Sequence, residues 1–424
     1  MITNDNLNYA GEHRNLFDLV PTSDDIFIDR EILRHTYVPK FLPHRQKEMM
    51  SLVVPLSSAL KNATPSNLVL YGLPATGKTV TTKLIGEEIK VKAEELSKKI
   101  YFIYINCNIT NTTYGVLQKI SSEIIDNEDD KIPFAGLSLD NIYAKLLTIL
   151  DKNGCIIIIV LDEVDKLKGD EALYMLTRMN TDLKKTKVSL ILISNNLLFK
   201  QLLDSRVNSS LGSENITFEP YNALQLQDIL LERVKVALKP NSFEEGVIPF
   251  CAALAAQDNG SARKALDLMR VSGEVAERNG AKKITIKHVI IAQSKIQEDC
   301  IKETINNLPT QFKLVLFSIS KKILKNKKNC LKQGITTGEA YAIYQDTCKE
   351  VCFKSLTQRR ITDIVQELDT LGLLITRVVS LGRHGKTKEI QLSVPPEEII
   401  CFLQKDDLIS SLSGFKIKDQ ARLF

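Results

Sequence analysis

Eight residues near the start of the chain have the composition of a loop that binds phosphate groups. They read Gly72-Leu-Pro-Ala-Thr-Gly-Lys-Thr79 and match the pattern GxxxxGK[ST], with an apolar run before them and a helical pattern after them. Glycines let the backbone wrap around phosphates, amides at a helix N-terminus point at them, and Lys78 can reach the β and γ oxygens. The segment predicts that a nucleotide is bound by Gly72, Pro74, Ala75, Thr76, Gly77, Lys78, Thr79 and Val80.

Two acidic residues and one amide follow the next apolar runs. IIIIVLDEVDKL ends its apolar part at Asp162 and Glu163, and SLILIS is followed by Asn195. Open α/β sheets bind ligands at the carboxyl ends of their strands, so we expect these side chains beside the phosphate loop. Asp162 would hold Mg²⁺ together with the Thr79 hydroxyl, and Glu163 would polarise the attacking water. Asn195 would orient that water or touch the γ-phosphate, unless it merely makes a turn.

The pattern of apolar residues predicts the elements that position these groups. Between Asn67 and Phe218, short β-branched runs alternate with helical stretches, which is typical of a parallel sheet covered by helices on both faces. From Asn222 to about Asn306, apolar residues recur only at helical spacing, which predicts an all-helical domain. After Leu308, helices precede two alternating runs joined by a basic, Gly-rich turn, which predicts a hairpin packed on helices.

These patterns divide the 424 residues into several parts. We expect a loosely structured segment at 1–25, a nucleotide-binding α/β domain at 26–221, an all-helical domain at 222–306, a C-terminal domain at 307–400 and a tail at 401–424. The 44% hydrophobic and 25% charged residues exclude a wholly disordered or fibrous chain. The apolar run 156–161 is too short to cross a bilayer, and the N-terminus lacks a signal-peptide pattern. We therefore expect a cytoplasmic protein without a membrane partner.

The basic charge of the chain is concentrated near its C-terminus. The whole chain has 56 Lys and Arg against 51 Asp and Glu, whereas residues 305–394 alone have fifteen against seven. A concentrated basic surplus is typical of proteins that neutralise nucleic-acid phosphates. A solvated Lys-rich surface is the alternative.

With its GxxxxGK[ST] loop, its Asp-Glu pair and its following polar residue, the sequence resembles the AAA+ ATPases. That resemblance implies a P-loop parallel sheet with strand order 5-1-4-3-2, a helical lid, and ATP or ADP with Mg²⁺ as cofactors. It also implies that Arg206, in LLDSRVNSSLG, acts on a neighbouring subunit and that Arg263, in NGSARKALDLMR, is a second sensor in the lid. Tyr221 and Arg233, in YNALQLQDILLERV, match a lid segment that faces the nucleotide.

More narrowly, the chain from about Tyr37 to Pro395 is similar to the archaeal replication initiators related to origin recognition complex and cell-division-control proteins. LDSRVNSSL, GSARKALDLMR, SLTQRRITDIVQELDTLGLL and SLGRHGKTKEIQL carry this resemblance. It implies a weak ATPase that uses ATP and ADP as a conformational switch. It also implies replication-origin duplex DNA, other initiator subunits and the replicative helicase as partners.

Two single positions and one segment qualify this resemblance. The family pattern has Pro at Ser205 and Asp at Ser261, so the neighbouring arginines would be held less rigidly here. Residues 127–139 correspond to an inserted element that touches DNA in the family, but their acidic start does not allow individual contacts to be named.

The sequence of the C-terminal domain predicts a helix-turn-helix even without the family resemblance. TTGEAYAIYQDTCKEV and LTQRRITDIVQELDTLGLL have the order of its two helices, and the hairpin behind them makes the unit winged. The expected core face of the second helix is Ile361, Ile364, Val365, Leu368 and Leu371. The opposite face presents residue types that bond base edges and phosphates, namely Gln358, Arg359, Thr362 and Gln366. Thr357 and Arg360 are further candidate DNA contacts.

The turn of the hairpin is a second candidate for contact with DNA. Its basic, Gly-flexible residues are Arg383, His384, Gly385, Lys386 and Lys388. Such a wing suits a backbone or minor-groove contact. A winged helix can also bind protein, although a basic wing argues against that use.

These features favour an ATP-dependent initiator that binds origin DNA. An AAA+ DNA motor of the branch-migration helicase type is an alternative, because it also joins an ATPase domain to a winged helix. A nucleotide-gated transcriptional regulator is a third possibility. Processive unwinding would favour the motor, and a discrete footprint on origin repeats without unwinding would favour the initiator.

Overall fold

The computed structural model describes residues 26–125, 136–328, 334–380 and 386–414. The chain divides into two compact units, Met1–Ala292 and Gln293–Phe424. Most of the predicted insertion at 127–139 and the wing-tip residues Arg383, His384 and Gly385 lie outside the described residues. Among the described helices, none combines the length and the hydrophobicity that a membrane crossing requires.

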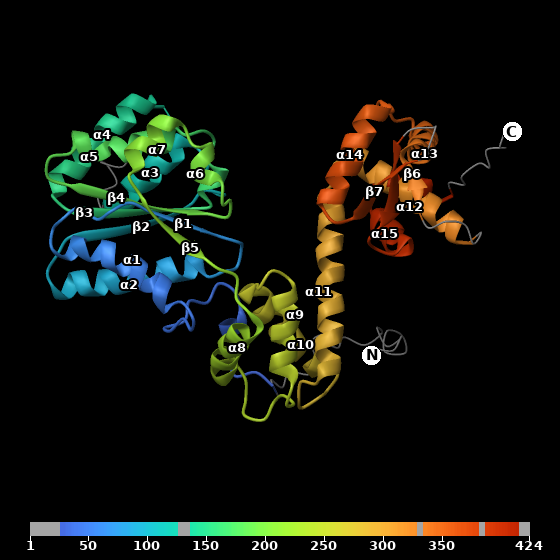
Figure 1. Cartoon of the computed structure of the whole chain (residues 1–424), viewed down its shortest axis with the longest axis horizontal. Coiled ribbons are helices and arrows are strands. Elements are labelled where there is room, and N and C mark those ends of the chain that lie inside the picture. The colour runs from blue at the N-terminus through green and yellow to red at the C-terminus, as the bar shows by residue number, and fades with distance from the viewer. Residues whose placement is uncertain (1–25, 126–135, 329–333, 381–385, 415–424) are drawn as a thin grey trace, which may run out of the picture. The chain divides into compact units, whose positions relative to one another are not determined.

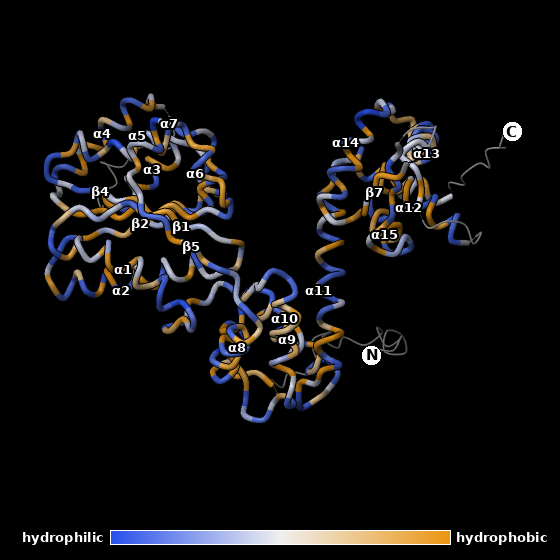
Figure 2. Tube along the Cα trace, viewed as in Figure 1, coloured by the Kyte–Doolittle hydropathy of each residue, from blue (hydrophilic) through white to orange (hydrophobic). Residues whose placement is uncertain are grey.

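A five-stranded parallel sheet forms the centre of the first unit (Figure 1). Its strands are β1 (Leu68–Gly72), β2 (Ile100–Asn106), β3 (Ile156–Asp162), β4 (Lys187–Ser194) and β5 (Glu214–Phe218). They lie in the order β2-β3-β4-β1-β5, and every neighbouring pair is parallel. The predicted P-loop order 5-1-4-3-2 is thereby confirmed. All residues of β1 and β3 are buried, which accounts for their uninterrupted apolar sequences (Figure 2).

Helices cover both faces of this sheet (Figure 1). On one face, α1 (Gln46–Leu60) and α2 (Lys78–Glu95) bury Leu52, Leu56 and Ile89 against the strands. The other face is covered by α3 (Thr113–Ile124), α4 (Leu139–Asn153), α5 (Glu171–Asp182), α6 (Phe199–Leu202) and α7 (Ser205–Leu211). A short 3-10 helix, η5 (Val164–Lys166), follows β3 directly. The two apolar layers fix the carboxyl ends of β1, β3 and β4 next to one another.

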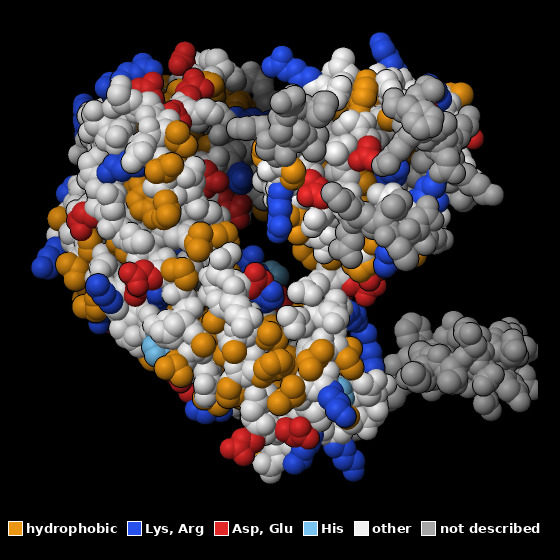
Figure 3. All heavy atoms as spheres, turned by 45° about the vertical axis from the view of Figure 1, so that its right-hand side comes forward, with side chains coloured by type: hydrophobic (Ala, Val, Ile, Leu, Met, Phe, Trp, Pro, Cys, Tyr) orange, Lys and Arg blue, Asp and Glu red, His pale blue; other side chains and the backbone are white. Residues whose placement is uncertain are grey.

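The lid follows β5 and is helical, as predicted. It contains α8 (Ala223–Ala237), α9 (Val247–Gln257), α10 (Ala262–Arg278) and the first residues of α11 (Ile286–Asn307). The 3-10 helix η3 (Glu31–Leu33) and the residues before it pack on the lid, with the Phe27 ring over Gly273, where an added Cβ would come within 2.4 Å of the ring. Figure 3 shows apolar side chains on the lid surface. Two apolar residues of α8, Leu224 and Val236, are exposed.

The second unit is a winged-helix domain, as predicted. Its elements are α12 (Thr310–Lys328), β6 (Ile335–Thr336), α13 (Thr337–Glu350), α14 (Gln358–Thr370), β7 (Leu374–Ser380), β8 (Lys386–Leu392), α15 (Pro396–Leu403), α16 (Asp407–Ser410) and the 3-10 helix η7 (Ser411–Gly414). The strands form an antiparallel sheet in the order β6-β8-β7. Its core extends past residue 400, because Leu403, Ile409 and Leu412 are buried in it.

One expected core residue of α14 is exposed. Ile361, Ile364, Val365 and Leu368 are buried, but Leu371 is 50% exposed, so the prediction for Leu371 was wrong. The helix ends at Thr370 and the chain turns at Gly372, which has a φ of +74°. Because of this turn, the buried positions after the helix belong to Leu373 and Leu374.

Candidate nucleotide and DNA sites

The loop between β1 and α2 has the backbone conformation of a phosphate cradle. Gly77 precedes α2 with a φ of +98°, and Gly72 has a φ of +153° with a Cβ position only 2.4 Å from the Phe218 carbonyl oxygen. Both positions therefore require glycine. The first N–H groups of α2 have no acceptor within the helix, so this helix end is available to an anion.

Lys78 is buried beneath the loop and is held by its carbonyl groups. Its Nζ atom donates hydrogen bonds of 2.8 Å to the carbonyl oxygens of Gly72 and Leu73. Burial lowers the pKa of Lys78 to about 8, against the opposing influence of Asp162 and Asp165. A phosphate group would give this ammonium a stronger, ionised acceptor.

Asp162 ends β3 next to the start of α2, and its carboxylate accepts three hydrogen bonds. Oδ2 accepts from the Thr79 hydroxyl at 2.7 Å and from the Tyr104 hydroxyl at 2.6 Å, and Oδ1 accepts from the Glu163 amide at 2.9 Å. Asp162 is only 4% exposed. The adjacent hydroxyl and carboxylate oxygens are the hard donors that Mg²⁺ prefers, so Thr79 and Asp162 fit that ion.

Glu163 and Asn195 follow β3 and β4 at the same edge of the sheet. Glu163 has a left-handed backbone, with a φ of +53°, and directly precedes η5. Asp165 in η5 accepts hydrogen bonds from the Ser194 hydroxyl at 3.0 Å and the Asn195 amide at 3.4 Å. This link between η5 and the end of β4 holds the backbone that carries the Asn195 side chain.

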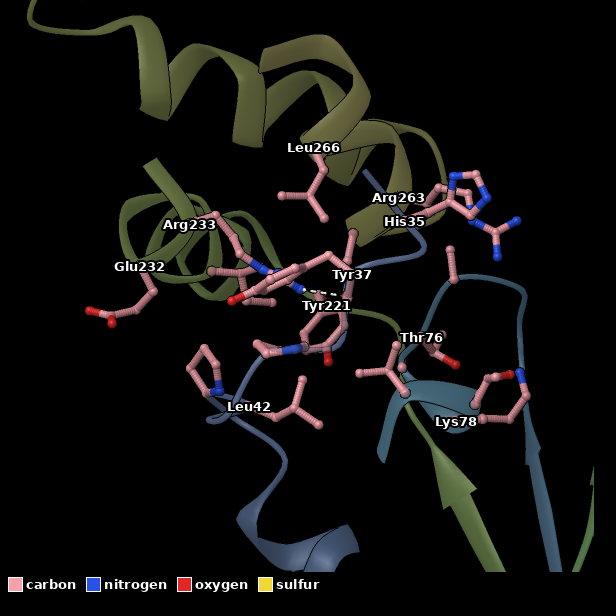
Figure 4. Close-up of a pocket in the computed structure, with 18 of the residues that line it drawn as sticks. His35, Tyr37, Leu42, Thr76, Lys78, Tyr221, Glu232, Arg233, Arg263 and Leu266 are labelled. Carbon is pink, nitrogen blue, oxygen red and sulfur yellow. Dashed lines mark hydrogen bonds between the residues drawn. The ribbon is translucent and has the colours of Figure 1, made fainter. Parts of the chain in front are cut away.

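A cavity of about 560 Å³ opens between the loop, the segment before α1 and the lid (Figure 4). The predicted residues that line it are Pro74, Ala75, Thr76, Gly77, Lys78, Thr79, Val80, Asp162, Glu163, Asn195, Tyr221, Arg233 and Arg263. Gly72 does not line it but supports Lys78 from below. The structure thus brings together groups from three strand ends and two lid helices.

The lid contributes two arginines to the cavity, and they differ in burial and in hydrogen bonding. Arg233 is partly buried, donates to the carbonyl oxygens of Ile32 at 3.3 Å and Tyr37 at 3.4 Å, and lies 4.7 Å over the Tyr37 ring. Burial lowers the pKa of Arg233. Arg263 is exposed, and Figure 4 shows it beside His35 at the lid side of the cavity. Within the described residues Arg263 has no hydrogen bond or ion pair, so its charge is available to a ligand.

Arg206 does not reach the cavity of its own chain. It lies at the start of α7, 69% exposed, and its Nε and Nη2 atoms bond Asp204 at 3.1 and 2.8 Å. Its guanidinium also lies 5.5 Å from the centre of the Tyr174 ring. The other predicted residues of the nucleotide site are therefore assembled without Arg206.

Sequence reasoning missed four residues that organise this site: Tyr37, Arg45, Tyr104 and Asp165. Tyr104 and Asp165 lie at or after strand ends, where a search for polar residues beside Asp162 would have found them. Arg45 and Tyr37 precede α1 in a segment without a recognisable motif, and only tertiary contacts reveal them.

The outer face of α14 is exposed and largely without partners. Gln358 and Arg359 are exposed and have no ion pair among the described residues, and Thr357 precedes the helix without capping it through its side chain. Arg360 lies 3.5 Å from Glu367 and 3.8 Å from Asp363, so acidic residues of its own helix already accompany it.

Two further residues that were predicted to contact DNA form hydrogen bonds within the winged-helix domain. The Thr362 hydroxyl donates to the Gln358 carbonyl oxygen at 3.0 Å. Lys388 in β8 donates to Gln366 Oε1 at 2.6 Å, which ties the wing to α14. Lys386 begins β8, next to the part of the wing outside the described residues.

Comparison with known families covers most of the chain. An AAA domain profile matches residues 61–202, a Cdc6 AAA+ ATPase-type lid domain profile matches 227–294, and a CDC6 C-terminal winged helix domain profile matches 303–401. An ORC1-type DNA replication protein of Pyrococcus horikoshii is 47% identical over 410 residues, which are 96% of this chain and 97% of that relative. This chain belongs to the ORC1-type DNA replication proteins. An ORC1-type relative from Methanosarcina acetivorans is 44% identical over 403 residues, 95% of this chain and 96% of the relative.

Solved structures agree with membership in the ORC1-type family. The Aeropyrum pernix ORC1 protein, in a complex with DNA, is 38% identical with a TM-score of 0.79, covering 92% of this chain and 99% of that one. Cdc6p from Pyrobaculum aerophilum is 26% identical with a TM-score of 0.57, covering 91% of this chain and 99% of that one. The predicted AAA+ fold with a lid and a winged helix is therefore confirmed at the level of family and fold.

Proposed function

We propose that this ORC1-type chain binds ATP or ADP with Mg²⁺ in its cavity and binds origin duplex DNA through its winged helix to initiate replication. The observation that carries the proposal is the convergence of Lys78, Asp162, Asn195 and Arg263 on one cavity. Its DNA-binding part is supported by the related Aeropyrum pernix ORC1 protein, which is in a complex with DNA.

Phosphate binding would exchange bonds that already exist in the protein. Lys78 would leave the Gly72 and Leu73 carbonyl oxygens for the β and γ oxygens of the nucleotide. Thr79 and Asp162, whose oxygens are 2.7 Å apart, would hold Mg²⁺. The ion, when bound, neutralises charge on the phosphate oxygens.

Hydrolysis would use residues around the far end of the phosphates. Glu163 would polarise the attacking water, Asn195 would orient it, and Arg263 would contact the γ-phosphate from the lid. Arg206 would act on the nucleotide of a neighbouring subunit, because it lies outside its own cavity. A single chain would then hydrolyse ATP slowly, and the bound nucleotide would serve as a conformational switch.

DNA binding would use the exposed face of α14 and the wing. Gln358 and Arg359 near the start of α14 would reach base edges in the major groove, with Thr357, Arg360 and Thr362 beside them. The wing residues Arg383, His384, Gly385, Lys386 and Lys388 would contact the backbone or the minor groove. The partners would be other initiator subunits on the same DNA and the replicative helicase, in the cytoplasm.

A nuclease footprint of the full chain with ATP, on fragments of its own genome, tests this proposal. We expect a discrete protected segment at the replication origin and no strand separation on a forked duplex. Processive ATP-driven unwinding would overturn the proposal in favour of a branch-migration motor. Protection confined to promoters would overturn it in favour of a transcriptional regulator.

A further inference from the structure

Arg45 is a buried arginine that the proposed chemistry does not use. It lies directly before α1, is 3% exposed, and does not line the nucleotide cavity. Its Nε atom donates to the Thr76 carbonyl oxygen at 3.1 Å and to the Tyr221 hydroxyl at 2.9 Å, and Nη2 donates to the Glu219 carbonyl oxygen at 2.6 Å. One guanidinium therefore joins the phosphate loop to the chain that leaves β5.

The bond to Thr76 fixes a peptide plane of the phosphate loop. All described peptide bonds are trans, and in a planar trans peptide the C=O and the following N–H point in opposite directions. Anchoring the Thr76 oxygen on Arg45 therefore directs the Gly77 N–H away from Arg45. Gly77 lines the cavity, and its N–H is one of the donors at the start of α2 that a phosphate would use.

The bonds to Glu219 and Tyr221 fix the base of the lid. These residues link β5 to α8, and the Arg45 guanidinium lies 3.9 Å from the centre of the Tyr221 ring. Another part of the lid packs closely against Tyr221. A Cβ added at Gly260 would come within 2.3 Å of the Tyr221 carbonyl oxygen. The lid also contacts the loop directly through the Ala262 amide, 3.4 Å from the Ala75 carbonyl oxygen.

Geometry distinguishes Arg45 from a cation that merely attracts phosphate. Glu48 lies 2.6 Å from Nη1, and its side chain is 14% exposed, so an adjacent carboxylate balances the charge of Arg45. What the residue supplies is a planar set of donors aimed at three acceptors besides Glu48. Lysine retains the charge but lacks this planar arrangement.

We propose that Arg45 is a positioning residue that aims the Gly77 amide at the nucleotide phosphates and couples the phosphate loop to the base of the lid. Nucleotide binding and the order of residues 219–223 then change together. The inference rests on the proposed binding of ATP or ADP in the cavity.

The test compares the full-length wild type with Arg45→Lys and with the control Arg270→Lys. Arg270 is a partly buried arginine of α10 that pairs with Asp267 and Glu274 of its own helix, away from the cavity. Calorimetric titration with ADP measures affinity, and hydrogen exchange with and without ADP measures order at residues 73–79 and 219–223. Thermal unfolding of the nucleotide-free proteins checks that each variant is folded.

We expect Arg45→Lys to bind ADP about tenfold or more weakly, as for the loss of a hydrogen bond to a charged group. ADP should slow exchange at both segments in the wild type and in Arg270→Lys, and at residues 73–79 alone in Arg45→Lys. A folded Arg45→Lys protein with wild-type affinity and protection of both segments would overturn the inference. A wild type that binds neither ADP nor ATP would overturn the proposed function instead.

Tyr221→Phe keeps the test decisive if Arg45→Lys does not fold. This change removes the hydroxyl that accepts from Arg45 and keeps the ring beneath the guanidinium. We expect protection of residues 219–223 by ADP to weaken in this variant. Full protection at both segments in Tyr221→Phe would contradict the coupling.

Discussion

The phosphate-loop side of the nucleotide cavity and the outer face of α14 differ in how their polar and charged side chains are held. Lys78 and Asp162 in the cavity, and Arg45 outside it, are buried, and each already bonds other groups of the protein. The Gln358 and Arg359 side chains are exposed to water and have no protein partner among the described residues. The phosphate-loop side of the cavity is organised in the absence of the proposed nucleotide, whereas the helix face would gain its partners only from the proposed DNA.

This difference determines how each region responds to change. A buried polar group that loses its partner costs free energy in the folded protein, so substitutions in the cavity should have large effects. Exposed charges interact weakly until phosphates or bases approach, so substitutions on α14 and the wing should leave the fold intact and alter salt-dependent binding.

The largest effect is expected at Lys78. Lys78→Ala should abolish binding of ATP and ADP, because the loop loses the cation next to the β and γ oxygens. Glu163→Gln should bind ATP but fail to hydrolyse it. Calorimetry and phosphate release measure the two steps. Lys83→Ala, on the same helix but over the Tyr104 ring, is the control and should behave as wild type. Unchanged hydrolysis in Glu163→Gln would remove it from the catalytic role.

Arg206 should affect hydrolysis only in assemblies. Arg206→Ala should leave the ATP affinity of the monomer intact and lower assembly-dependent hydrolysis by about 10³-fold, as for other arginines supplied in trans. Arg178 lies 4.7 Å over the Tyr174 ring that Arg206 also approaches, so Arg178→Ala is a matched control. Weak ATP binding by the Arg206→Ala monomer would show that the residue acts in its own subunit.

On α14, Arg359 should contribute to sequence preference. Arg359→Ala should cost about 1 to 3 kcal/mol on a cognate duplex and less on a scrambled one. Arg360→Ala should cost less than Arg359→Ala, because Glu367 and Asp363 already accompany Arg360. Fluorescence titrations of both duplexes measure the difference. Equal losses on cognate and scrambled DNA would make α14 a backbone clamp.

Nucleotide affinity should fall at alkaline pH. The pKa of Lys78 is lowered to about 8 without nucleotide, and adjacent phosphates would raise it, so binding above that pH must take up a proton. The affinity for ADP should decrease by about tenfold per pH unit above pH 8 and stay level below it. Calorimetry in buffers of different ionisation enthalpy measures the proton uptake. Affinity that is level through pH 9.5, or proton release, would contradict this role of Lys78.

The smallest effect is expected from the wing. Arg383→Ala and Lys386→Ala should weaken cognate and scrambled duplexes by similar factors and flatten the salt dependence by about one unit of slope per lost contact. Titrations across a salt series measure the slopes. Wild-type affinity and slope in both variants would make the wing a structural hairpin.

Those parts of the fold and of the candidate site that depend on local sequence patterns could be predicted from the sequence. The loop around Lys78 and the acidic end of β3 follow from short motifs, and the strand order follows from the AAA+ resemblance that those motifs support. The alternating β7 and β8 sequences likewise predict a hairpin. Each of these features is formed by residues that are close together in the sequence, so a short segment is enough to predict it.

Prediction failed where contacts between distant segments decide the structure. Arg45 bonds Thr76, which is 31 positions away in the sequence, and Glu219, which is 174 positions away, so no local sequence pattern predicts its role. Leu371 continues the apolar spacing of α14, but the helix has ended before it. Apolar residues at helical spacing predict burial only within the helix. The point at which α14 ends depends on the chain turn at Gly372 and on the burial of Leu373.

The central claim is that one folded chain holds a preorganised nucleotide site and a separate DNA-binding face. Its most direct test is to titrate the wild type, Lys78→Ala and Arg359→Ala with both ADP and a cognate duplex. We expect Lys78→Ala to lose ADP binding and to keep DNA binding within about tenfold, and Arg359→Ala to keep wild-type ADP affinity while losing preference for the cognate duplex. A folded variant that lost both ligands together, or Lys78→Ala with wild-type ADP affinity, would contradict it.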